Sequence, residues 1–148
     1  MRCPFCNIEE SQVKDSRSAE AGASIRRRRQ CSSCGSRFTT FERVQLRELY
    51  VQKGNGRNEI FEREKLVRSM IIATRKRNIS EEKLDLAVNG IVRQLESSGE
   101  KSIDSKKIGL LVMGELLKLD KVSYIRYASV YRDFKEQEDF KEFIESVE

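Results

Sequence analysis

Two short segments, Cys3-Pro4-Phe5-Cys6 and Cys31-Ser32-Ser33-Cys34, decide how the first third of this sequence folds. They contain all four cysteines of a 148-residue chain that has no histidine. Each C-x-x-C pair places two thiolates on one tight turn, and two pairs provide the closed tetrahedral shell that zinc favours, with no open position for catalysis. The expected metal is one structural Zn²⁺, and its expected ligands are Cys3, Cys6, Cys31 and Cys34.

Two alternatives to zinc use the same cysteines. The pairs could be redox-active, or they could bind an iron–sulfur cluster. Zinc is favoured because no thioredoxin-like βαβ pattern surrounds either pair. The 24 residues between Cys6 and Cys31 would then form a hairpin that brings the two turns together. Such a small segment cannot bury a core unaided, and the metal would replace it.

Around the cysteines, the sequence predicts three short strands. Residues 13–19 and 24–31 read as strands on either side of the turn Ala21-Gly22-Ala23. Residues 37–44 alternate apolar and polar positions and read as a third strand. The N-terminal segment is therefore expected to be a small β module.

The net charge of +5 is concentrated in this module. Residues 1–48 carry ten Lys and Arg against six Asp and Glu, whereas residues 49–148 carry nineteen against eighteen. The densest point is Arg26-Arg27-Arg28-Arg29, and on a strand Arg26 and Arg28 would face one way and Arg27 and Arg29 the other. Arg17 and Arg37, on neighbouring strands, could extend this surface. A solvated charge run is the alternative, but the concentration favours a polyanionic partner, with nucleic acid the leading candidate.

After residue 48 the pattern becomes mostly helical. Residues 49–53 and 57–61 flank Gly54-Asn55-Gly56 and predict a hairpin. Apolar periodicity and capping residues then predict helices from about residue 62, from residue 80, from Asp104 or Ser105, and from Asp120 to about residue 134. Residues 138–147 could add a short terminal helix.

The predicted hairpin carries cations immediately before a helix N-terminus. Lys53, Arg57 and Lys65 could bind phosphates there, although a solvated turn is the ordinary reading and no P-loop motif is present. Tyr124, Tyr127 and Tyr131 recur on one helical face. Core packing is the default interpretation of this stripe, and flanking of a purine is the alternative.

Neither a signal peptide nor an apolar run long enough to span a membrane is present in the sequence. We therefore expect a cytoplasmic protein without membrane contact.

Together these residues resemble the NrdR family, bacterial transcriptional repressors of ribonucleotide reductase genes in which a zinc ribbon precedes an ATP-cone. The resemblance covers nearly the whole chain and is carried by MRCPFC at 1–6, DSR at 15–17, SIRRRRQC at 24–31, CGSRFTTFERV at 34–44, VQKGNGRNEIFEREKL at 51–66 and YIRYASVYRDF at 124–134. It implies an α+β protein with a β zinc ribbon at 1–48, a mostly helical ATP-cone with a hairpin or small sheet at 49–139, and a tail or short helix at 140–148.

The resemblance also implies a function without catalysis. The chain would be a repressor that binds operator boxes in double-stranded DNA, senses ATP and dATP as allosteric ligands, and changes its oligomeric state with the nucleotide. Magnesium could accompany the phosphates. The implied DNA-binding residues are Arg17, Arg26, Arg27, Arg28, Arg29 and Arg37. The implied nucleotide-binding residues are Val51, Lys53, Arg57, Glu59, Lys65, Tyr124 and Tyr131.

Two other classes of function remain open from the sequence. One is a nucleotide-binding regulator that contacts an enzyme directly, with the ribbon as a protein-binding module. The other is a nucleotide hydrolase, which the lack of a recognisable catalytic base or paired metal-binding carboxylates disfavours.

Overall fold

The computed structural model describes residues 1–45 and 47–146, which form two compact units, Met1–Gln45 and Leu46–Glu148. The predicted α+β class is confirmed. Two residues of the predicted C-terminal tail, 147 and 148, lie outside the described part of the chain.

The first unit is one antiparallel sheet in the order β1-β2-β3. Its strands are β1 (Ser11–Ala19), β2 (Ser24–Cys31) and β3 (Arg37–Arg43), close to the three predicted ranges. A short 3₁₀ turn, η1 (Glu20–Gly22), joins β1 to β2 one residue earlier than the predicted turn.

This unit has almost no apolar core. Within residues 1–45, the buried side chains are those of Cys3, Ser24 and Cys31. Apolar burial normally supplies most of a domain's stability, and three small side chains cannot do so. The stability of this unit therefore depends on the region around the cysteines.

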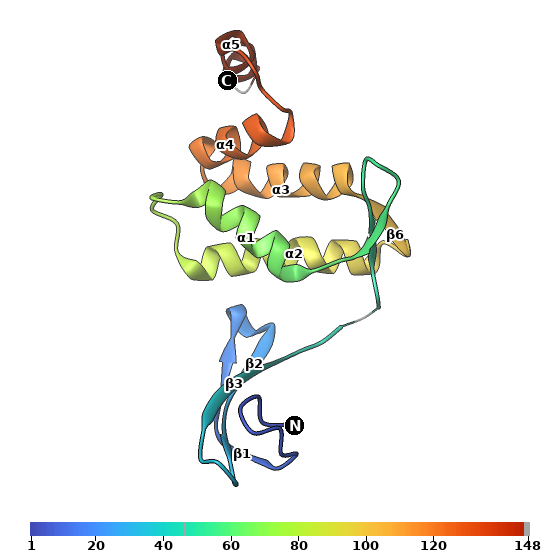
Figure 1. Cartoon of the computed structure of the whole chain (residues 1–148). Helices are drawn as coiled ribbons and strands as arrows, with labels where there is room; N and C mark the ends of the chain where they lie inside the picture. The colour runs from blue at the N-terminus through green and yellow to red at the C-terminus, as the bar shows by residue number, and fades with distance from the viewer. Residues whose placement is uncertain (46, 147–148) are drawn as a thin grey trace. The chain divides into compact units, whose positions relative to one another are not determined.

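Over its described residues, 47–146, the second unit combines a small sheet with five helices. The sheet has the order β5-β4-β6 and contains β4 (Tyr50–Gln52), β5 (Asn58–Ile60) and β6 (Ser102–Asp104). The β4–β5 pair is the predicted hairpin, closed by a turn in which Gly56 has a φ of 80°. The third strand, β6, was not predicted from the sequence; it pairs in parallel with β4 at one end of α2 and α3 (Figure 1).

The helices are α1 (Arg63–Thr74), α2 (Glu81–Ser97), α3 (Ser105–Leu119), α4 (Lys121–Tyr131) and α5 (Gln137–Glu145). Side chains of Ser80, Asp104 and Asp120 accept backbone N–H groups at the starts of α2, α3 and α4, as the sequence predicts for capping residues. Helix α4 ends three residues before the predicted limit, at Tyr131.

Apolar side chains from α1, α2, α3 and β6 form the main core of this unit. Its fully buried members include Met70, Ile91, Ile103 and Leu116. Helix α5 packs separately, through Phe143, against Tyr124 and Phe134. The core thus fixes α1 and α3 beside the hairpin, and the space between these elements is the cavity described below.

Candidate functional site

The two C-x-x-C turns of the first unit are built alike. The carbonyl of Cys3 accepts the N–H of Asn7 at 2.9 Å, and the carbonyl of Cys31 accepts the N–H of Gly35 at 3.1 Å. Asn7 and Gly35 have φ angles of 63° and 72°, a region that glycine adopts freely and asparagine tolerates. Each turn therefore folds its two thiols back toward the same point.

The four sulfur atoms meet there as a group within 4.8 Å of one another. The Sγ atoms of Cys3 and Cys34 are 3.7 Å apart, and those of Cys6 and Cys31 are 3.5 Å apart. Zinc–sulfur bonds of about 2.3 Å in a tetrahedron separate ligands by about 3.8 Å. The residues present fit a four-thiolate zinc site.

The shifted pKa values of the thiols also indicate that a cation belongs between them. Hydrogen bonds from the side chain and then the backbone of Ser36 lower the pKa of Cys34 to about 6. In contrast, the pKa of Cys6 is raised to about 12: the Ile8 backbone N–H favours its thiolate, but burial and the three neighbouring sulfurs oppose it more strongly. Four crowded thiolates repel one another, and a divalent metal removes that repulsion.

Strand pairing sorts the arginines of the sheet onto two faces. Arg26 pairs directly with Arg17 of β1 and with Phe41 of β3, and directly paired residues share a face. Gln30 pairs with Arg37, and alternation places Gln30 on the face of Arg26. One face therefore carries Arg17, Arg26, Arg28 and Arg37.

The arginines of the opposite face are held within the sheet. The Arg27 guanidinium donates to the Glu42 carboxylate at 2.9 and 3.1 Å and to the Ser16 hydroxyl at 3.1 Å. Arg29 donates to the Thr40 hydroxyl at 3.0 Å. The two faces thus differ in chemistry. Arg27 and Arg29 tie the strands together on one face. On the other face Arg17 pairs with Asp15 of its own strand at 2.9 Å, and Arg28 and Arg37 are exposed.

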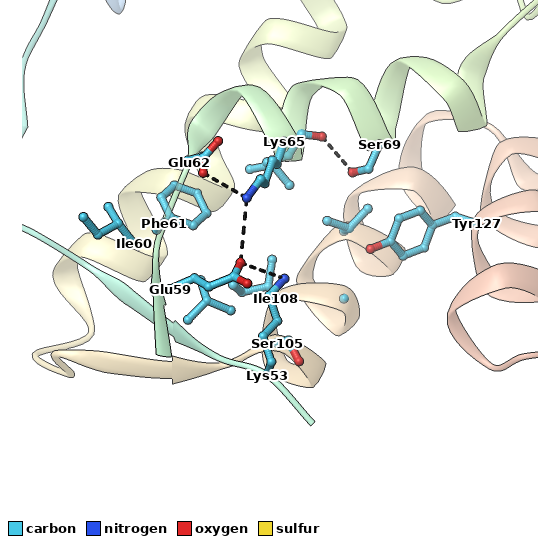
Figure 2. Close-up of a pocket in the computed structure, with 14 residues that line it drawn as sticks. Lys53, Glu59, Ile60, Phe61, Glu62, Lys65, Ser69, Ser105, Ile108 and Tyr127 are labelled. Carbon is cyan, nitrogen blue, oxygen red and sulfur yellow. Dashed lines mark hydrogen bonds and ion pairs between the residues drawn. The ribbon is translucent and has the colours of Figure 1, made fainter. Parts of the chain in front are cut away.

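In the second unit, a cavity of about 190 Å³ lies between the hairpin, α1, α3 and α4 (Figure 2). Its lining residues are Val51, Lys53, Glu59, Ile60, Phe61, Glu62, Lys65, Leu66, Ser69, Ser105, Ile108, Gly109, Val112 and Tyr127. Every surrounding element contributes, so the cavity exists only when this unit is folded.

One side of the cavity is charged. The Glu59 carboxylate lies 3.6 Å from the Lys53 ammonium and 3.7 Å from the Lys65 ammonium. Glu62 lies 2.9 Å from Lys65. Glu62 first, and Glu59 to a lesser degree, raise the pKa of Lys65. Lys65 therefore carries positive charge at neutral pH, as phosphate binding requires.

The other side is apolar and aromatic. Figure 2 shows the Tyr127 hydroxyl directed into the cavity, and this hydroxyl has no hydrogen-bond partner among the described residues. Burial, followed by the neighbouring Tyr131, raises the pKa of Tyr127, so the hydroxyl stays protonated. It remains available to donate to a ligand.

A second cavity, of about 520 Å³, adjoins the first because Ser69 and Tyr127 line both. It is lined further by Ile72, Ala73, Arg126, Ser129, Val130 and Tyr131. Tyr131 is fixed by a 2.8 Å hydrogen bond from its hydroxyl to the Lys106 carbonyl, and its ring lies against Gly109 of α3. The pair of cavities offers a charged end and an apolar end.

Five of the seven residues implied for nucleotide binding line these two cavities: Val51, Lys53, Glu59, Lys65 and Tyr131. Arg57 lies exposed at the hairpin turn, outside both linings. Tyr124 packs against Phe143 with ring centroids 5.3 Å apart, also outside both linings.

Sequence reasoning missed the contribution of α3 to the cavity. Ser105, Ile108, Gly109 and Val112 all line it, as does Ser69 of α1. The signal that could have indicated this is Gly109, since a glycine inside a helical pattern is one sign of a close approach by another group, although Gly114 of the same helix meets none.

Among the residues that the structure describes, the four cysteines are the only group of three or more side chains arranged to hold a metal ion. No described helix is long and apolar enough to cross a membrane.

Comparisons with known proteins agree with both parts of the chain. A family described as transcriptional repressor NrdR-like, N-terminal domain, matches residues 1–42, and the ATP cone domain family matches residues 49–137. A protein of Bartonella tribocorum named transcriptional repressor NrdR is 60% identical over 147 residues, covering 99% of this chain and 92% of that protein. Proteins with the same name from Caulobacter sp. strain K31 and Rhodospirillum centenum are 62% and 60% identical, covering 97% and 99% of this chain and 92% and 96% of those proteins.

Proposed function

Since the chain belongs to the NrdR family of transcriptional repressors, we propose that it represses ribonucleotide reductase genes by binding their operators and sensing ATP and dATP. The protein is a regulator rather than an enzyme, since its relatives are named transcriptional repressors. A repressor acts where the chromosome is, so we place it in the cytoplasm. Its zinc ribbon and ATP-cone divide the two tasks.

We assign DNA binding to residues 1–48, nucleotide binding to 49–139, and a terminal helix or tail to 140–148. The two compact units, Met1–Gln45 and Leu46–Glu148, and the two family matches support this division. Zinc stabilises the ribbon because so little apolar surface is buried there.

The observation that carries the DNA-binding proposal is the sorting of the arginines. Arg17, Arg26, Arg28 and Arg37 share one face, whereas Arg27 and Arg29 are bonded to other strands on the opposite face. Arginine's planar fork can bind phosphate or guanine. We therefore assign the face of Arg26 and Arg28 to direct DNA contact, and we assign Arg27 and Arg29 to stiffening of the sheet that presents it.

The cavity pair is the proposed nucleotide site. Lys53 and Lys65 supply charge for the phosphates, and the apolar wall around Tyr127 supplies a surface for the base. Glu59 and Glu62 already pair with lysines, so magnesium, if bound, would be held mainly by phosphate oxygens and water.

Control of repression requires that the nucleotide favour one assembly of the chain over another. A ligand with equal affinity for both assemblies would shift nothing. We propose that the bound nucleotide controls self-association of the chain. An oligomer that presents several ribbons can engage repeated operator boxes together.

The test is fluorescence anisotropy of the zinc-loaded protein with promoter DNA from a ribonucleotide reductase operon, with ATP, dATP or both, across a range of salt. Arg26→Ala/Arg28→Ala should lose most of the affinity and lower the salt slope by about one per phosphate contact removed. The matched double variant Arg27→Ala/Arg29→Ala removes equal charge from the other face and should lose less. Failure of the wild-type protein to select promoter DNA with any nucleotide would favour a regulator that contacts proteins instead.

A further inference from the structure

Phe41 of β3 is an exposed aromatic residue beside the arginines that we assign to DNA contact. It is 46% exposed, and it pairs directly with Arg26 of β2, so the two side chains leave the sheet on the same face. Single apolar residues are common on protein surfaces, and exposure alone gives Phe41 no role. Its surroundings, by contrast, indicate one.

The face that holds Phe41 is otherwise built from polar, charged or small side chains. The structure describes every residue of β1, β2 and β3, and within these strands the other large apolar side chains, Val13, Ile25 and Phe38, alternate onto the opposite face. Phe41 therefore places one apolar group in a surface whose arginines suit a polyanion.

The ring of Phe41 is held in place without being buried. The guanidinium of Arg43, two residues further along β3, lies 5.2 Å from the ring centroid, which is within the range of a cation–π contact. That guanidinium donates two hydrogen bonds to the Glu20 carboxylate, at 2.7 and 2.9 Å, which fix the cation over the ring. A side chain that is fixed before binding loses less conformational freedom when a partner covers it.

The spacing of Arg26 and Phe41 matches the dimensions of the DNA major groove. The groove is about 12 Å wide and admits a two-stranded β-ribbon, such as the pair β2 and β3. Directly paired side chains leave a sheet about 5 Å apart, and successive base pairs are about 3.4 Å apart. Arg26 and Phe41 can therefore reach the same base pair or neighbouring base pairs.

The chemistry of the ring selects one base. Arginine binds phosphate through its charge or guanine through paired hydrogen bonds, whereas a phenyl ring can do neither. The apolar group that base edges display in the major groove is the C5 methyl of thymine, and phenylalanine is among the residues that contact it. We propose that Phe41 is a specificity-determining residue that contacts a thymine methyl group beside the position contacted by Arg26. This inference rests on the proposed function, since it concerns the same DNA-binding face.

Uracil-substituted DNA isolates the methyl contact. A promoter duplex synthesised with deoxyuridine in place of thymidine keeps every base pair and phosphate and lacks only the methyl groups. Fluorescence anisotropy compares the two duplexes with the full zinc-loaded chain, under the nucleotide condition that gives the tightest promoter binding. Burial of one methyl-sized group changes an equilibrium constant by about fourfold, so the wild-type chain should bind the uracil duplex about fourfold or more weakly.

Three variants locate the effect. Phe41→Ala should bind the thymine duplex about fourfold or more weakly than the wild-type chain, and it should bind both duplexes equally. Ile25→Ala removes a 39% exposed apolar side chain from the opposite face, so it is the matched control and should keep the wild-type preference. Phe41→Leu keeps an apolar side chain of smaller area and should show an intermediate preference, which provides the test if Phe41→Ala loses its zinc or its sheet.

Other results overturn the proposal in distinguishable ways. A wild-type chain that binds both duplexes equally refutes the methyl contact, and weaker binding of both by Phe41→Ala would then indicate a ring inserted between base steps. An undiminished preference for thymine in the Phe41 variants assigns the methyl effect to another residue. If the wild-type chain selects no promoter DNA with either base, the proposed operator binding itself fails.

Discussion

Substitution of two glycines in the same helix should have opposite effects on stability. A methyl group on Gly109 of α3 would overlap the ring of Tyr131, whereas one on Gly114, five residues further along, would meet nothing within 4 Å. Both positions are helical, so alanine contributes about 1 kcal/mol of helix propensity at each. The two variants therefore differ in the steric contact and in burial, Gly109 being buried and Gly114 exposed.

The expected magnitudes follow from the contacts. Overpacking a closed interface costs about 1–3 kcal/mol. Displacing Tyr131 also strains its hydrogen bond to the Lys106 carbonyl, which contributes about 1 kcal/mol. Offset by propensity, Gly109→Ala should destabilise the chain by about 1–3 kcal/mol, and Gly114→Ala should stabilise it by about 0.5–1 kcal/mol.

Urea unfolding of the zinc-loaded chain, followed by far-ultraviolet circular dichroism, measures both changes, because the helices lie in the second unit. A double-mutant cycle with Tyr131→Ala isolates the contact: in that background Gly109→Ala should become neutral or stabilising. Equal shifts for Gly109→Ala and Gly114→Ala, in sign and size, would refute the steric argument.

Three further changes test other parts of the structure. Removal of zinc by a chelator should unfold residues 1–45 while the helical signal of the second unit persists, as hydrogen exchange by segment would show. Asp120→Asn keeps the helix cap but loses the charge that Arg77 first, and then Ser123, stabilise by holding the pKa of Asp120 well below its usual range. Losing the charged hydrogen bond should cost about 1.5 kcal/mol at about pH 7. The cost should shrink as the pH falls below about 4, because the stability contributed by a carboxylate with a depressed pKa is lost on acidification. Urea unfolding at several pH values tests this, and a cost that does not change with pH would contradict it. Phe143→Ala should detach α5 without unfolding the rest, which faster exchange confined to residues 137–145 would demonstrate.

Local signals were sufficient to predict most of the fold. The caps at Ser80, Asp104 and Asp120 and the apolar spacing after them locate three helices within a few residues. The hairpin followed from its glycines. Strand β6 was missed because it has three residues, only one of which, Ile103, is buried, and its partner Val51 lies 52 positions earlier. Long-range pairing of so short a segment has no periodic signature.

The residues of the candidate site likewise divide into those predictable from local sequence and those placed by tertiary packing. Lys53 and Lys65 lie within thirteen positions of sequence, and local reasoning grouped them before the structure placed them around one cavity; Glu59 was added by the family resemblance. The wall formed by α3 depends on tertiary packing, and so does the placement of Tyr124 against Phe143 instead of the cavity. Periodicity assigns a residue to a face of its helix, but it does not say which neighbour that face meets.

The parallel pairing of β4 with β6 has a consequence for the order of events during translation. All the residues of the ribbon have been synthesised once Arg43 is in place, whereas the hairpin lacks its neighbouring strand until Asp104 has been added. At about 5–20 residues per second, a ribosome needs about 3–12 s to cover that interval. The nascent chain can therefore acquire its metal and its arginine-bearing sheet before the proposed nucleotide site exists. If the proposed nucleotide control is correct, a premature stop codon in this interval would release a ribbon that escapes it.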